Sequence, residues 1–328
     1  MSMMKPEIPI PRIKPPALQP GDTVGIVAPA SNIQRDLLNA GCDMLRRLGY
    51  KPFYLDSIFD QDLYFAGSAE RRARELEEMF VREEVRAVLC ARGGYGSNYL
   101  LGKVNLEKIA RHPKIFVGYS DNTTLLTYFA DSIGLVTFHG PMVTKDFAHA
   151  DGVDLSSWEA ALTGHSEWAV PSDSGMKPLV EGSVEGVLYG GCLSMLAASL
   201  GTPYEIRTAG TILFLEDVAT KPFQIDRMLM QLKLAGKFEN VRGIIFGEMT
   251  DCAQQKKDQG YTLEEVVLRV VGSLGIPVAF GLRSGHVSHR NVTLPIGVRA
   301  ALSVSSGEAT LKILEAATAT VAVSARRT

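Results

Sequence analysis

The sequence predicts an α/β protein with an N-terminal, mostly parallel sheet flanked by helices and a second, mixed α/β domain. In the first half of the chain, apolar runs of strand length alternate with amphipathic helical segments, a pattern typical of parallel sheets covered on both faces. From about 146 to 178 this periodicity weakens, and "VPSDSGMKP" has the composition of a linker. Strand and helix patterns then resume in a more mixed order, so we expect a second domain.

Composition limits the kinds of function. The 328 residues suit two domains, and 46% hydrophobic with 21% charged residues is typical of a globular protein with a sizeable core. A net charge of -2 gives no basic field for nucleic acid. No signal peptide and no run of about 20 apolar residues is visible, which predicts a cytoplasmic protein without membrane contact. Four scattered cysteines and the absence of an HExxH pair indicate no disulfide framework, no metal and no cofactor.

The first half begins with a proline-rich segment, 1–22, which predicts an extended arm because proline fixes φ and removes a donor. The domain that follows, 23–165, carries the alternating pattern. Strands are expected at 23–31, 51–56, 85–96, 114–121 and 135–142, and helices at 32–50, 68–84 and 122–134.

The second half follows a predicted linker at 166–178 and forms a predicted domain at 179–328. A strand and helix are expected within 184–205, strands at 210–217, 241–252 and 292–304, and helices at 223–238 and 262–275. The last helix opens with Thr262 followed three residues later by Glu265, a capping-box pattern.

The stretch "KIFVGYSDNT", 114–123, moves from an apolar run into small polar residues across one glycine. A sharp strand-to-helix turn exposes its turn residue and aims backbone N–H groups at a ligand, so Ser120 fits a nucleophile. Asn122 stands where the GxSxG pattern needs glycine. The alternative is that Ser120 or Asp121 only caps the helix.

The stretch "ARGGYGSNYL", 91–100, places three glycines after a strand. Such a loop lets the backbone approach a ligand and aims N–H groups at an anion. Its GGxG spacing matches neither the dinucleotide motif nor the P-loop. An amide of Gly93 or Gly94 beside Ser120 would fit half of an oxyanion hole.

Acidic residues and histidines supply the other candidates. Glu216 and Asp217 end a predicted strand, where a carboxylate either orients a base or is merely solvated. His286 and His289 lie in a glycine-rimmed loop, and His139 at a strand end is a rival for the role of base. The remaining histidines, with polar neighbours, are expected at the surface: His112, His149 and His165.

Six ordered motifs together resemble the LD-carboxypeptidase family of serine peptidases, whose best known members are muramoyltetrapeptide carboxypeptidases: "RGGYGSNYLL", "FVGYSDNTTLL", "FHGPM", "YGGCLSML", "LFLEDVATKPFQIDRMLMQL" and "GHVSHRNVTLPIG". The resemblance implies that Ser120 is the nucleophile, Glu216 the orienting acid and His286 the general base, in a cleft between the two domains. It also implies an oxyanion hole made by the N–H groups of Asp121 and Gly94.

The resemblance further implies the substrate and the partners. The expected substrate is a small murein peptide whose terminal D-alanine is released through an acyl-enzyme, and a homodimer is expected. We expect Arg92 or Arg283 to bind the substrate carboxylate. Family relatives that confer microcin C immunity cleave aminoacyl-nucleotides and stack the base on an aromatic side chain, for which only Phe223 is available after "FLED". The third hypothesis is a non-catalytic protein that binds an anionic ligand.

Overall fold

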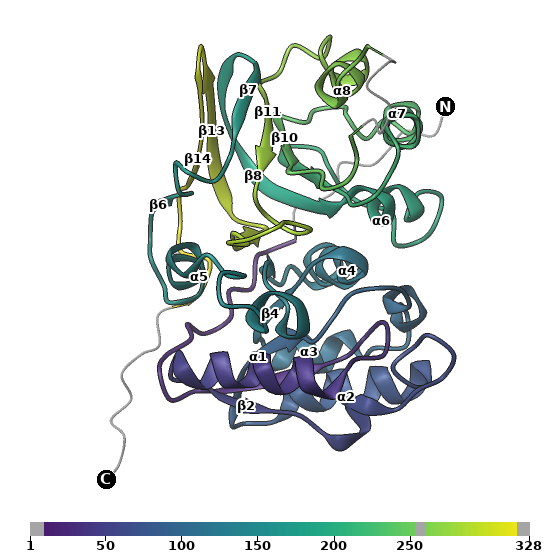
Figure 1. Ribbon diagram of the computed structural model, residues 1–328, viewed down its shortest axis with the longest axis vertical. Helices are drawn as coiled ribbons and strands as arrows, with labels where there is room; N and C mark the ends of the chain where they lie inside the picture. The colour runs from purple at the N-terminus through teal and green to yellow at the C-terminus, as the bar shows by residue number, and fades with distance from the viewer. Residues whose placement is uncertain (1–9, 254–259, 320–328) are drawn as a thin grey trace.

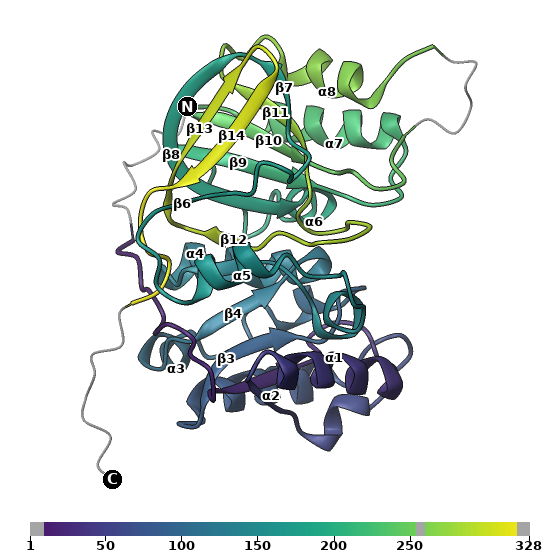
Figure 2. The ribbon, with the colours of Figure 1, turned by 60° about the vertical axis from the view of Figure 1, so that its left-hand side comes forward.

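Figures 1 and 2 show a computed structural model of the chain, which describes residues 10–253 and 260–319. Two sheets, each with its own helices, form two lobes that stack on one another, with α4, α5 and β12 lying between them (Figure 2). The predicted α/β class, with a parallel-rich sheet flanked by helices and a second mixed α/β part, is confirmed. None of the described helices has the length and apolar character needed to cross a bilayer.

The first sheet has the strand order β12-β5-β4-β3-β1-β2. Its strands are β1 (Thr23–Val27), β2 (Lys51–Phe53), β3 (Val85–Cys90), β4 (Ile115–Gly118), β5 (Thr137–His139) and β12 (Leu294–Ile296). All neighbouring pairs are parallel except β12 with β5. The central strands β3 and β4 are almost wholly buried, as expected for a parallel sheet covered on both faces.

Helices cover both faces of this sheet. The helices are α1 (Arg35–Arg47), α2 (Ala69–Val81), α3 (Leu106–Arg111), α4 (Thr123–Ile133) and α5 (Leu155–Leu162). Apolar residues of α1 and α5 join one core cluster, whereas those of α2, α3 and α4 join another. Helix α2 begins where Ser68 accepts a hydrogen bond from the Arg71 N–H, and α4 ends at Gly134 with φ +74°.

The second sheet has the strand order β6-β14-β13-β8-β9-β10-β11-β7. Its strands are β6 (Trp168–Ala169), β7 (Lys177–Val180), β8 (Gly182–Cys192), β9 (Thr211–Glu216), β10 (Gly243–Gly247), β11 (Val278–Leu282), β13 (Arg299–Ser305) and β14 (Glu308–Ile313). The four strands β8 to β11 are parallel, and both sides of the sheet continue with antiparallel strands. This sheet is therefore mixed.

Three helices pack on one face of the second sheet: α6 (Leu193–Ala198), α7 (Pro222–Leu234) and α8 (Leu263–Val271). Their buried residues form one cluster with residues of β9, β10 and β11. The capping box predicted for α8 is present, because Thr262 accepts from the Glu265 N–H and Glu265 accepts from the Thr262 N–H. The opposite face of the sheet belongs to a cluster that also contains residues of the first sheet, so the two lobes share core.

The structure differs from the predicted division of the chain in two details. The predicted linker, 166–178, contains β6 and the beginning of β7, which both pair within the second sheet. Strand β12 leaves the C-terminal part and pairs with β5 of the first sheet. Neither pairing has a local signal, because both join segments far apart in sequence. The described part of the predicted arm, 10–22, lies against the molecule and buries Leu18, whereas 1–9 lie outside the described residues.

Candidate active site

Ser120 lies on a tight turn between β4 and α4. Its φ is +64°, a left-handed conformation that is costly for a residue other than glycine and recurs at functional sites. A single 3₁₀ turn, Ser120–Asn122, connects the strand to the helix. Helix α4 has Asn122 as N-cap residue without a side-chain cap bond. Ser120 therefore does not cap the helix, and its hydroxyl is free to bond elsewhere.

Two glycines leave room for this turn. A Cβ at Gly93 would lie 2.8 Å from the Ser120 Cβ and 2.9 Å from its Oγ, closer than side chains pack. A Cβ at Gly118 would meet the Cys90 Sγ at 3.0 Å. The glycine loop after β3 thus lies directly against the serine. Its next residue, Gly94, has φ +105° and would carry a Cβ only 2.3 Å from the Ser31 Oγ.

The polar residues after Ser120 fasten the glycine loop to the turn. Asp121 accepts a hydrogen bond from the Ser97 N–H at 2.7 Å, and burial raises the pKa of its carboxyl. Asn122 accepts from the Ser97 hydroxyl at 3.2 Å and donates to the Arg92 carbonyl at 3.1 Å. These bonds explain why a buried strand ends in small polar side chains: they hold two loops together in a site with little water access.

Ser120, His286 and Glu216 form one hydrogen-bonded row. The Ser120 Oγ lies 2.9 Å from the His286 Nε2, and the His286 Nδ1 lies 2.7 Å from the Glu216 Oε2. Glu216 ends β9 and is 1% exposed, whereas His286 lies in the loop between β11 and β12 and is partly exposed. The structure brings together three side chains that are separated by 96 and 70 positions in the sequence.

The carboxylate of Glu216 is kept ionised by its neighbours. Burial by itself raises its pKa, but interactions with His286 and His139 outweigh this effect and hold the pKa well below its usual range. Glu216 Oε2 also accepts from the backbone N–H of His286 at 3.1 Å. One oxygen thus fixes both the position and the ring orientation of His286.

The loop that carries His286 is held by Asn291, a residue that no sequence motif marks as functional. Its side chain accepts from the Gly285 N–H at 3.0 Å and donates to the Gly285 carbonyl at 3.1 Å. The Thr250 hydroxyl donates to the carbonyl of His286. Asn291 is fully buried. Its role could have been suspected from the sequence, because Asn291 lies in "GHVSHRNV" just before a predicted strand. A buried amide in such a position has to find hydrogen-bond partners.

The other predicted site residues lie in different surroundings. Arg92 is exposed and donates to the Asn32 carbonyl at 3.1 Å, next to the glycine loop. Arg283 is half-buried beside Ser174 and Gly175, and its Nε and Nη2 have no hydrogen bond within the described residues. Asp217 accepts from the N–H of Ser194 and from the Thr220 hydroxyl, so it shapes its own loop.

Of the six histidines, His112, His149, His165 and His289 are exposed. His139 is fully buried on β5, and its Nε2 lies 3.7 Å from the Glu216 Oε1. The rival base is therefore a neighbour of the acid, while His286 bonds to Ser120. Within residues 10–253 and 260–319, no group of three or more His, Cys, Asp or Glu side chains is arranged to hold a metal ion.

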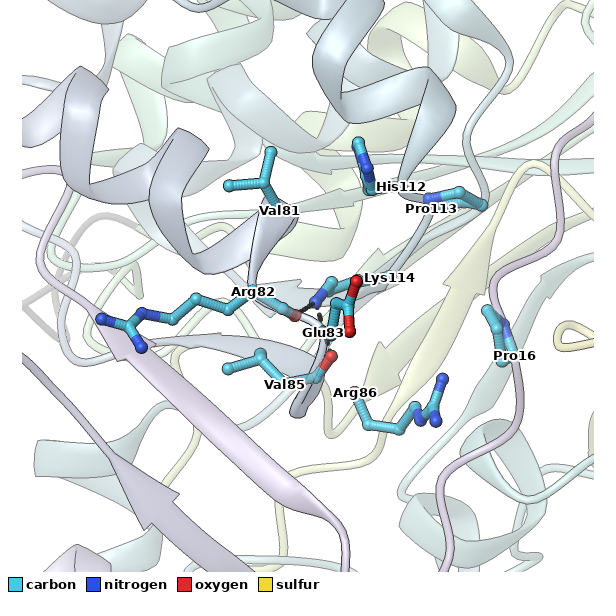
Figure 3. A pocket seen from close by; sticks show the side chains of 9 residues that line it. All are labelled: Pro16, Val81, Arg82, Glu83, Val85, Arg86, His112, Pro113 and Lys114. Atoms are coloured by element: carbon cyan, nitrogen blue, oxygen red, sulfur yellow. Dashed lines mark hydrogen bonds between the residues drawn. The ribbon is translucent and has the colours of Figure 1, made fainter.

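Figure 3 shows the residues that line a surface pocket of about 310 Å³, and Ser120, His286 and Glu216 are not among them. It opens at the amino ends of β3 and β4, whereas Ser120 follows the carboxyl end of β4. The Lys114 Nζ there donates to the carbonyls of Val85 and Arg82, and burial lowers the pKa of Lys114 to about 8. The ammonium group thus already has backbone partners, and none of the predicted site residues lines this pocket.

The row of serine, histidine and glutamate can carry out nucleophilic catalysis. A neutral imidazole can take the serine proton, and a buried carboxylate on its other nitrogen stabilises the imidazolium that forms. Backbone N–H groups at the start of α4 and in the glycine loop are available to donate hydrogen bonds to a developing oxyanion.

Comparison with known proteins gives matches over most of the chain. Residues 24–140 match the LD-carboxypeptidase N-terminal domain, and residues 185–302 match the LD-carboxypeptidase C-terminal domain. A Bacillus subtilis protein, "Probable murein peptide carboxypeptidase", is 40% identical over 301 residues, covering 91% of this chain and 94% of that protein.

Two kinds of solved structure are similar. The muramoyltetrapeptide carboxypeptidase from Oxalobacter formigenes aligns with a TM-score of 0.80 and 32% identity, over 90% of this chain and 99% of that chain. The microcin C7 self immunity protein MccF in complex with aspartyl sulfamoyl adenosine aligns with a TM-score of 0.85 and 27% identity, over 94% of this chain and 100% of that chain.

Proposed function

The chain belongs to the LD-carboxypeptidase family, and from this premise we propose that it is a serine carboxypeptidase that cleaves the bond to the terminal D-alanine of a murein tetrapeptide. The observation that carries the proposal is the hydrogen-bonded row from Ser120 through His286 to Glu216, with links of 2.9 and 2.7 Å. The murein peptides named for the Bacillus subtilis and Oxalobacter formigenes relatives support the substrate class.

In the proposed mechanism, the Ser120 Oγ attacks the carbonyl carbon and its proton passes to the His286 Nε2. Glu216 stabilises the imidazolium, while the N–H groups of Asp121 and Gly94 hold the oxyanion. The C–N bond then breaks, and D-alanine leaves with the proton returned by His286. Water hydrolyses the remaining ester, with His286 again as base, and frees Ser120.

A second candidate function is hydrolysis of an aminoacyl-nucleotide, since MccF is similar to this chain and was solved with aspartyl sulfamoyl adenosine. One observation favours it. Phe223, 55% exposed at the start of α7, lies with Tyr261, 41% exposed, on a surface pocket of about 240 Å³. Exposed aromatic rings can stack on a nucleobase.

The test is a comparison of two substrates by mass spectrometry of the products. We expect L-Ala-D-Glu-diaminopimelate-D-Ala to lose D-alanine, and to do so faster than an aminoacyl sulfamoyl adenosine is cleaved. Faster cleavage of the nucleotide would move the assignment to the second candidate. Cleavage of neither substrate by folded protein would favour a non-catalytic binding protein.

The proposal includes a homodimer in the cytoplasm, as the resemblance and the sequence predict. Sedimentation equilibrium at micromolar concentration tests the first part, and we expect twice the chain mass of 35.6 kDa. A single-chain mass at all concentrations would remove the dimer from the proposal without affecting the chemistry.

A further inference from the structure

His139 is a second histidine beside Glu216, and it takes no part in the proposed proton transfers. It ends β5, is 0% exposed and lies beside Gly118 of β4 and Leu294 of β12. Its ring packs between Tyr119 and Phe214, at centroid distances of 5.9 and 5.1 Å. It comes from the first sheet, whereas Glu216 comes from the second, so the contact between them joins the two lobes.

The hydrogen bonds around His139 determine where its protons are. The Ser284 hydroxyl has one proton, which it donates to the Val292 carbonyl at 2.8 Å. The His139 Nδ1 lies 3.0 Å from the same oxygen and therefore has to be the donor of that bond. A neutral ring protonated on Nδ1 would aim the lone pair of Nε2 at the Glu216 carboxylate, which is unfavourable.

The same pair of atoms is left without other partners. Within the described residues, neither the His139 Nε2 nor the Glu216 Oε1 has a hydrogen bond, and the two lie 3.7 Å apart. This distance is within the range of an ion pair and too long for a good hydrogen bond. A proton on Nε2 would give both buried atoms a favourable neighbour.

The charges of the neighbouring residues before catalysis also favour a protonated His139. His286 has to be neutral before it can take the proton of Ser120. Within the described residues, the basic side chains at ion-pair distance from the buried Glu216 are His286 and His139, so with His286 neutral the carboxylate depends on His139 for a cation. We propose that His139 is a buried imidazolium that directs its Nε2–H at the Glu216 Oε1 and so holds the acid ionised and oriented while His286 is neutral.

The two carboxylate oxygens of Glu216 have different partners. Oε2 serves the ring and backbone of His286, and Oε1 faces His139. Gly285 leaves room for this pair, because a Cβ at that position would lie 2.6 Å from the Glu216 Cδ and 2.9 Å from the His139 Cε1. His139 is a positioning residue, and this role rests on the proposed function of the row.

The protonation state can be measured without any substrate. In protein labelled with ¹⁵N-histidine, long-range ¹H–¹⁵N spectra at neutral pH distinguish an imidazolium from either neutral tautomer, and the six histidines keep the spectrum simple. The His139→Gln variant identifies the signal by its loss. We expect both ring nitrogens of His139 to be protonated. A neutral His139 ring of either tautomer overturns the proposal, whichever substrate the enzyme proves to use.

Variants test whether this state supports the nucleophile. The readout is the rate at which a fluorophosphonate labels Ser120, which forms an O–P bond, releases fluoride and passes the hydroxyl proton to His286. We expect His139→Leu to slow labelling on the order of 10²-fold, and His139→Gln, which retains an N–H donor, about tenfold. On a cleaved substrate the loss should be in kcat, with KM unchanged.

Phe214→Leu is the control, because it removes a ring that packs on His139 but no donor. We expect it to lower Tm and leave the labelling rate unchanged. Labelling of His139→Leu at the wild-type rate overturns the proposal, and so does an equal loss in Phe214→Leu. If His139→Leu does not fold, the spectrum of the wild type decides.

Discussion

The turn that carries Ser120 and the loop that carries His286 are held in place by different means. The turn depends on backbone conformation, because Ser120 has φ +64° and Gly93 lies directly against its side chain. The loop depends on polar groups: Glu216 accepts twice from His286, and Asn291 bonds twice to Gly285. The proposed nucleophile, Ser120, should therefore be sensitive to small changes of volume, and the proposed base, His286, to changes of charge and hydrogen bonding.

The largest effect is expected from removal of the nucleophile itself. Ser120→Ala should lower kcat about 10⁴-fold or more, the scale of losing a triad member, since no other group in the row can form the ester. Steady-state rates of D-alanine release measure it, with Tm as the control for folding. Turnover of the variant at the wild-type rate would reject Ser120 as nucleophile.

The second largest effect is expected from Glu216, whose negative charge holds the loop that carries His286. Glu216→Gln keeps the shape but replaces a carboxylate by an amide, so His286 loses the anion that orients it and stabilises its charged form. We expect kcat to fall about 10³-fold, less than for Ser120→Ala, because the base itself survives. A loss equal to that of Ser120→Ala would contradict an orienting role.

A smaller effect is expected from volume added at the turn. Gly93→Ala places a Cβ 2.8 Å from that of Ser120, which has to shift by some tenths of an ångström. We expect kcat to fall about tenfold, since a misplacement of about 1 Å can cost about 10²-fold and this shift is smaller. Gly201→Ala is the control, because nothing lies within 4 Å of the new Cβ; its φ of +75° should lower Tm, but the variant should retain its rate. Equal rates for the two variants would contradict steric control of the turn.

The smallest effect concerns stability and contrasts two buried carboxylates. Burial raises the pKa of Asp146, in the π-helical turn Val143–Phe147, to about 6. The folded state thus favours its protonated form, and its contribution to the free energy of unfolding falls as pH rises from about 4 to 6. Asp146→Asn should remove this fall and stabilise the protein by about 3 kcal/mol at pH 8, with no gain near pH 4.

Glu216 should behave in the opposite way, because its pKa is lowered on folding. Its contribution is present above its unfolded value of 4.5 and is lost as pH falls toward the folded value. Urea unfolding of the wild type and both neutral variants between about pH 3 and 8 measures the two slopes, with the Asp146 change above pH 4 and the Glu216 change below 4.5. Curves of the same sign for Asp146→Asn and Glu216→Gln would contradict the contrast.

The sequence predicts well what repeats locally. The alternation of apolar strands and amphipathic helices predicts the first sheet, and the Thr262–Glu265 capping box is present at the start of α8. The candidate nucleophile, acid and base came from ordered motifs, and the structure brings Ser120, Glu216 and His286 into one row. Each motif has a local cause, such as a turn, a strand end or a glycine-rimmed loop.

Contacts between distant segments could not be predicted in this way. The pairing of β12 with β5 joins residues more than 150 positions apart, and no local pattern encodes it. His139 looked like a rival base because its motif shows only a strand end, whereas its position beside Glu216 depends on the packing of two sheets. Asn291 likewise gains its importance from a loop closed in space.

Strand β12 also sets a limit on how the molecule can be divided. A fragment that stops before residue 179 lacks this strand, and β5 then presents unpaired N–H and C=O groups along an open edge. Such an edge recruits strands from other copies, so we expect the truncated half to precipitate on expression while the full chain does not. The sheet that leads to Ser120 thus receives its edge strand from the last fifth of the polypeptide. This sheet cannot be completed until residue 296 has been synthesised.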